Sequence, residues 1–178
     1  MTTKKPLERV QESNKLLEKI TLILPGFRGY KQREERREAD RIVRDHVYGV
    51  LESARDDLNK CFQALSDSKT AELMEPMNRL IARLDRIAEK VNHASYGYSG
   101  FFDAIKIEET DLDRMIAHDE QLMETARKFS EGVAGFRNDL DEGKFEDART
   151  TQRVLDGSLK TMEKAFDERK SVIEGVAV

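Results

Sequence analysis

Residues 39–65 read ADRIVRDHVYGVLESARDDLNKCFQAL, and this stretch decides the fold. Its apolar side chains recur every three or four residues, which is the period of one face of an α-helix. The recurring positions, which include one histidine, are Ala39, Ile42, Val43, His46, Val47, Val50, Leu51, Ala54, Leu58, Cys61, Phe62 and Leu65. A helix that begins at Tyr30 would be about 54 Å long at 1.5 Å per residue. The spacing therefore predicts one long amphipathic helix over 30–65.

Four further segments show the same helical period. A first helix is expected over about 6–24, because the proline of Pro25-Gly26 cannot continue it. Three more are expected over about 73–91, 110–140 and 145–176. Their apolar stripes are narrow, as in the seam between antiparallel coiled-coil helices. We therefore expect an all-α fold, an elongated up-down antiparallel bundle of about five helices that forms one domain over 1–178.

Composition and charge exclude several classes of protein. With 31 Lys and Arg against 35 Asp and Glu, the net charge is −4, which argues against a dedicated duplex-DNA binder. The only cysteine, Cys61, excludes an intrachain disulfide. No apolar run approaches the length of about 18 residues that a membrane span needs, and the first residues lack the apolar core of a signal peptide. We expect a cytoplasmic protein without a transmembrane segment.

Two connections between the predicted helices are rich in glycine and aromatic residues. They are PGFRGY at 25–30 and SYGYSGFF at 95–102, and they hold half of the chain's eight phenylalanines and four tyrosines. If the chain reverses at each break, both connections lie at the same end of the bundle. Aromatic side chains there either cover the core as a cap or form a binding platform. The candidate partner-binding residues are Phe27, Arg28, Tyr30, Tyr96, Tyr98, Phe101 and Phe102.

A basic stripe follows the first of these connections. On a helical wheel, one side of the long helix carries Arg33, Arg37, Arg41 and Arg44. The stripe is either a solvated helix face with charges paired three or four residues apart, or a surface for an acidic membrane or an acidic partner. The adjacent acidic strip of Glu34, Glu38 and Asp45 argues against nucleic acid.

The motifs of metal and nucleotide chemistry are absent from the sequence. Neither a Glu-x-x-His motif for a di-iron site, nor a His-Glu-x-x-His motif for zinc, nor a phosphate-binding glycine loop occurs, so no cofactor is expected. Two polar residues, His46 and Asp119, fall on apolar stripes. They are expected either to fix the helix register as a buried pair or, with His118, to form a small metal or ligand site.

Two segments of the sequence resemble known proteins. PGFRGYK with ERREAD (25–31 and 35–40) and YGYSGFFDA (96–104) are similar to segments of uncharacterised prokaryotic helical-bundle proteins of similar length, for which no activity is known. The resemblance implies no catalytic residues. It selects the same two aromatic connections as the topological argument.

These observations favour a non-enzymatic interaction or scaffold module. It would bind a protein partner, a second copy of itself or an acidic membrane surface through the aromatic-glycine end and the adjoining arginine face. One alternative is a small-ligand or metal-dependent helical enzyme with a site near His46 and Asp119. Another is a nucleic-acid accessory protein that uses the arginine face.

Overall fold

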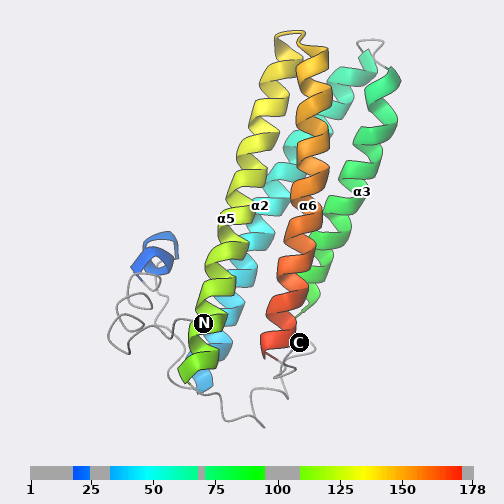
Figure 1. Cartoon of the computed structure of the whole chain (residues 1–178). Coiled ribbons are helices and arrows are strands. Elements are labelled where there is room, and N and C mark those ends of the chain that lie inside the picture. Colours follow the sequence, from blue (N-terminus) through cyan, green and yellow to red (C-terminus); the bar gives the residue numbers. More distant parts are fainter. Residues whose placement is uncertain (1–17, 25–32, 68–70, 95–108, 174–178) are drawn as a thin grey trace, which may run out of the picture.

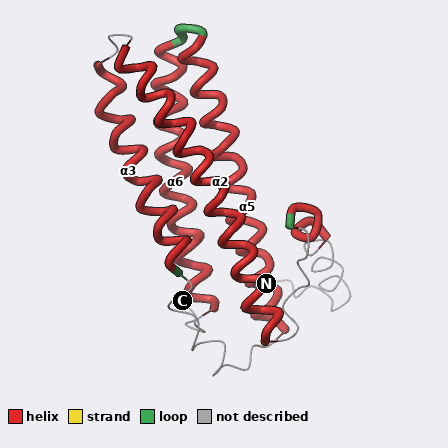
Figure 2. Tube along the Cα trace, turned by 180° about the vertical axis from the view of Figure 1, so that it is seen from behind, coloured by secondary structure: helices red, strands yellow, loops and turns green. Residues whose placement is uncertain are grey.

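The chain folds as a bundle of long helices. The computed structural model describes residues 18–24, 33–67, 71–94 and 109–173, and no strand occurs within these ranges (Figures 1 and 2). The long helices are α2 (Arg33–Asp67), α3 (Ala71–His93), α5 (Glu109–Asp141) and α6 (Phe145–Ile173). Residues 18–23 form a short helical segment that lies beside the bundle. The predicted all-α helical bundle is confirmed.

The four long helices stand at the corners of a square. α2 packs against α3 and α5, and α6 packs against the same two helices. Polar side chains interact between neighbouring helices. Arg55 of α2 forms an ion pair with Asp85 of α3, and the hydroxyl of Thr151 on α6 donates a hydrogen bond to Asp139 of α5. α2 and α6 therefore occupy one diagonal, and α3 and α5 the other.

Chain direction alternates along the sequence, yet two neighbouring pairs run parallel. Along the edge between α3 and α6, Arg83 forms an ion pair with Asp156 at 3.0 Å, and Lys90 forms one with Asp167 at 2.6 Å. Because both residue numbers rise together, α3 and α6 point the same way. α2 and α5 are parallel by the same reasoning. This follows from the connection between α3 and α5, which joins diagonal helices instead of neighbours (Figure 1).

A glycine ends α5 and starts the return of the chain. Gly143 has a φ of 71°, a left-handed conformation in which a side chain is strained. The amide of Gly143 donates to the carbonyl of Leu140, and that of Lys144 donates to the carbonyl of Asp139. These two bonds form a Schellman motif, which satisfies carbonyls that the end of a helix leaves free. The turn is therefore short and well defined.

The core follows the predicted stripes. On α2 the buried apolar side chains are Val43, Val47, Leu51, Ala54, Leu58, Cys61 and Leu65, and one hydrophobic cluster joins them to residues of α3, α5, α6 and the 18–24 segment. Pro76 lies inside α3, and its carbonyl accepts a hydrogen bond from the buried amide of Gln152 on α6. None of the helices within the described ranges carries an apolar stretch long enough to cross a bilayer.

Both aromatic connections lie outside the described residues. The helix ends that flank them are described: α2 begins at Arg33, α3 ends at His93 and α5 begins at Glu109. All three lie at the same end of the bundle, opposite the turn between α5 and α6 (Figure 1).

Candidate functional site

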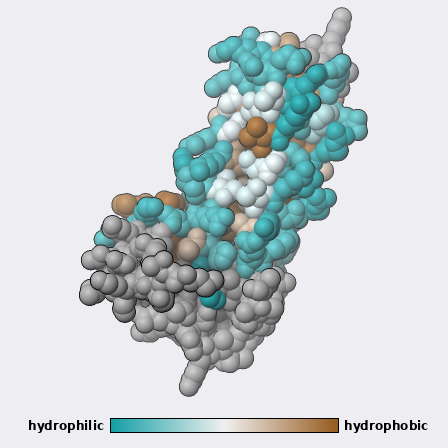
Figure 3. All heavy atoms as spheres, viewed as in Figure 1, coloured by the Kyte–Doolittle hydropathy of each residue, from teal (hydrophilic) through white to brown (hydrophobic). Residues whose placement is uncertain are grey.

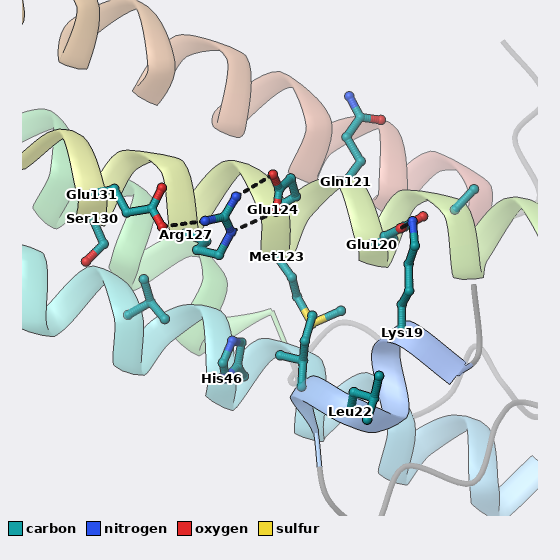
Figure 4. Close-up of a pocket in the computed structure, with 13 residues that line it drawn as sticks. Lys19, Leu22, His46, Glu120, Gln121, Met123, Glu124, Arg127, Ser130 and Glu131 are labelled. Atoms are coloured by element: carbon teal, nitrogen blue, oxygen red, sulfur yellow. Dashed lines mark hydrogen bonds and ion pairs between the residues drawn. The ribbon is translucent and has the colours of Figure 1, made fainter. Parts of the chain in front are cut away.

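A groove of about 810 Å³ opens between α2, α5 and the helical segment at 18–23 (Figure 4). His46 and Val50 of α2 and Met123 and Arg127 of α5 line it from the two neighbouring helices. The volume is within the range of known ligand sites, roughly 300–1,000 Å³. The groove is lined by Lys19, Leu22, Ile23, His46, Val50, Ala117, Glu120, Gln121, Met123, Glu124, Arg127, Ser130 and Glu131.

The floor of the groove is apolar. Val50 is half-buried and Met123 is buried, and the His46 ring lies opposite Met123 (Figure 4). Burial lowers the pKa of His46 below its ordinary value of 6.5, because an apolar surrounding disfavours the charged ring. At neutral pH the imidazole is therefore uncharged, and the floor offers no charge to a ligand.

The rim of the groove is charged, and its charges are paired within the chain. Arg127 donates two hydrogen bonds of 2.7 and 2.9 Å to Glu124 and another to Glu131. Lys19 donates a hydrogen bond of 2.8 Å to Glu120. The hydrogen bond from Arg127 lowers the pKa of Glu124 to about 2. Lys128, the residue after Arg127, also lies 3.4 Å from Glu124, so the three carboxylates of the rim are balanced by three cations.

One wall of the groove exposes large apolar side chains. Leu22 is 85% exposed and Ile23 is 45% exposed, whereas Ile20 and Leu24 of the same segment are buried in the core. Figure 3 shows hydrophobic surface on the side of the molecule where this segment lies. The segment is thus apolar on its inner and outer faces, which is unusual for a chain in which 37% of the residues are charged.

The arginine stripe is only partly as predicted. Arg41 is exposed and lies 4.0 Å from Asp45, its neighbour one helical turn later. Arg44, expected on the exposed face, is instead buried with 5% exposure. The reason is its register: Arg44 lies three and seven residues before Val47 and Leu51, both of which face the core. The side chains of Arg33 and Arg37, like the aromatic residues of 25–30 and 95–102, lie outside the described part.

The two polar residues of the apolar stripes, His46 and Asp119, lie in different surroundings. His46 lines the groove, while Asp119 on α5 is fully buried and is not a groove residue. His118 is half-buried. Among the described residues, no group of three or more His, Cys, Asp or Glu side chains is arranged to hold a metal ion.

The sequence contains one signal that points to the groove. The run Ile20-Thr21-Leu22-Ile23-Leu24 is more apolar than a single helix stripe requires. A helix that buries Ile20 and Leu24 must turn Leu22 and Ile23 elsewhere, since successive residues are about 100° apart. The apolar stripe of this predicted helix does not include Leu22 and Ile23. Comparison of the chain with family models, curated proteins and solved structures found no match.

Proposed function

We propose that the protein is a non-enzymatic interaction module that docks an apolar-faced helix of a partner in the groove between α2, α5 and the 18–23 segment. The observation that supports it most is the groove's concave apolar floor, bordered by the exposed Leu22 and Ile23. From Ala117 to Glu131 the groove follows α5 for about 21 Å at 1.5 Å per residue. That length suits about four turns of a docked helix, which is a common mode of peptide recognition.

The charge of the rim favours a protein partner over an acidic membrane. Lys19, Arg127 and Lys128 are all paired with Glu120, Glu124 or Glu131, so the rim has no excess positive charge to attract anionic lipid headgroups. A helix that brings aliphatic side chains to the floor does not need such a charge. The arginines at the start of α2 and the aromatic connections are proposed to extend this contact at the same end of the bundle.

The test uses a synthetic probe, a fluorescein-labelled amphipathic helical peptide of about 18 residues with leucines at the i, i+3, i+4 and i+7 positions. Binding to the full chain is measured by fluorescence anisotropy. We expect Leu22→Asp to weaken binding at least about 10-fold, because it places a charge in the apolar wall. Leu22 is 85% exposed, so the fold does not depend on it.

The matched control is Val154→Asp, which changes an aliphatic residue of α6 that is 63% exposed and does not line the groove. It should bind the peptide as the wild type does. Equal loss in both variants, or in neither, would refute the groove as the docking site. Flotation with phosphatidylserine vesicles distinguishes the membrane alternative. Vesicle binding that is lost in Leu22→Asp, without any peptide binding, would replace the protein partner by a lipid surface.

A further inference from the structure

The short helical segment at 18–23 packs beside α2 and α5 through aliphatic side chains. Ile20 of this segment and Leu24 directly after it are buried in the hydrophobic core, and Lys19 forms an ion pair with Glu120 of α5. Next to the segment lies the open groove, which His46 and Val50 of α2 line (Figure 4). A helix with similar aliphatic residues therefore fits the open groove as the segment fits beside α2 and α5.

The outer face of the segment supplies such residues. Leu22 and Ile23 are exposed and lie directly at the edge of the groove. An apolar projection and an apolar groove thus share one face of the molecule. A twofold contact between identical chains requires this arrangement, because each copy must offer both halves of the contact.

The charges of the segment also suit the rim. Glu18 and Lys19 balance each other, and the residues from Ile20 to Leu24 carry no charge. The rim pairs nearly all of its own charges, so an occupant with a strong net charge would find no compensating partner. A neutral aliphatic segment is therefore the best match.

Resting on the proposed function, we infer that the partner of this groove is a second copy of the chain, whose 18–24 segment inserts Leu22 and Ile23 reciprocally. The contact would cover Leu22, the most exposed large aliphatic side chain of the described residues, and occupy part of the groove in both copies. The protein would then work as a symmetric dimer.

Sedimentation velocity of the full chain between about 1 and about 200 μM tests the dimer. We expect a concentration-dependent monomer–dimer equilibrium for the wild type and for Val154→Asp. Leu22→Asp should shift the dimerisation constant at least about 10-fold toward monomer, with unchanged helical content by circular dichroism. A wild-type chain that stays monomeric throughout, or a dimer that Leu22→Asp does not weaken, overturns the inference.

Disulfide trapping locates the contact. Leu22→Cys and Ser130→Cys proteins are prepared separately, mixed and oxidised, so that a mixed disulfide forms only between copies. We expect this mixed dimer, and none when Val154→Cys replaces Ser130→Cys; the reverse pattern contradicts the inference. A monomeric chain that still binds the amphipathic peptide would refute the dimer and leave the proposed function intact. Absence of peptide binding at protein concentrations at which the chain is monomeric would refute the proposed function itself.

Discussion

At the scale of single residues, two charged side chains are buried in the largely apolar core. Arg44 of α2 is 5% exposed and Asp119 of α5 is fully buried, on neighbouring helices. Both have interaction partners, as a buried charge requires. Buried charges contribute less to stability than to fixing one helix register. We assign this role to Arg44 and Asp119.

His46 makes the stability of the bundle sensitive to acid. Its pKa is lowered by burial, so between that value and the ordinary 6.5 the unfolded chain binds more protons than the folded chain. Stability from this residue is therefore complete above about pH 6.5 and falls as the pH falls through the lowered pKa. We expect His46→Leu to lose less Tm than the wild type between about pH 7.5 and about pH 5.

Thermal unfolding followed by circular dichroism measures this difference. Met123→Leu, a neighbouring groove residue that does not titrate, should keep the pH dependence of the wild type. If His46→Leu shows the same pH dependence as Met123→Leu, the histidine does not contribute to acid sensitivity.

At the scale of elements, glycines inside helices have different roles. A Cβ added at Gly132 of α5 would lie 2.9 Å from a δ-methyl of Leu155 on α6, so glycine allows these two helices to approach closely. A Cβ at Gly157 of α6 would meet nothing within 4 Å. Gly157 therefore weakens the helix without serving the packing of the described residues.

This contrast predicts opposite effects of one substitution. Gly157→Ala should stabilise the chain by about 0.5–1 kcal/mol, the usual difference in helix propensity. Gly132→Ala should give no gain or lose about 1 kcal/mol, because overpacking against buried Leu155 offsets that difference. Urea denaturation at constant m-value gives both free energies. An equal gain in the two variants would contradict the assigned role of Gly132.

The helices themselves could be predicted from sequence, but these roles could not. The three-four spacing around Leu51 and Leu58 and the break at Gly143 placed α2 and the end of α5 close to where the structure has them. Spacing says which residues face inward and says nothing of how closely two helices approach. Gly132 and Gly157 therefore look alike in the sequence. The helical wheel places Arg44 with the exposed arginines, whereas its register with Val47 turns it into the core.

At the scale of the whole molecule, the arrangement of neighbours determines the site. Alternating direction follows from the sequence pattern, whereas the parallel pairing of α2 with α5 does not. The stretch between α3 and α5 is long enough to lead to a neighbouring or a diagonal position, and all the apolar stripes are similar. The groove brings His46 beside Met123, and that contact depends on this choice. For this reason the sequence pattern predicts the aromatic end of the bundle and the single groove residue His46, but not the groove between α2 and α5.

Cys61 reports on unfolding of the bundle as a whole. It lies buried on α2, and burial raises the pKa of its thiol to about 11, so the reactive thiolate is scarce at neutral pH. We expect labelling by a thiol reagent to be slow in buffer and to rise with urea together with the loss of helical circular dichroism. Ser53→Cys, an exposed position about two turns earlier on α2, should label rapidly without urea. Rapid labelling of native Cys61 would show that the core opens locally.

The tight turn after α5 is a suitable site for attaching the protein to a surface. Glu142 is exposed there, at the opposite end from the start of α2 and away from the groove. A single biotin attached at this position would hold every molecule on a sensor chip by the same end of the bundle and leave the groove open to the flowing buffer. Binding kinetics recorded in this way would report on the groove without interference from the immobilisation chemistry.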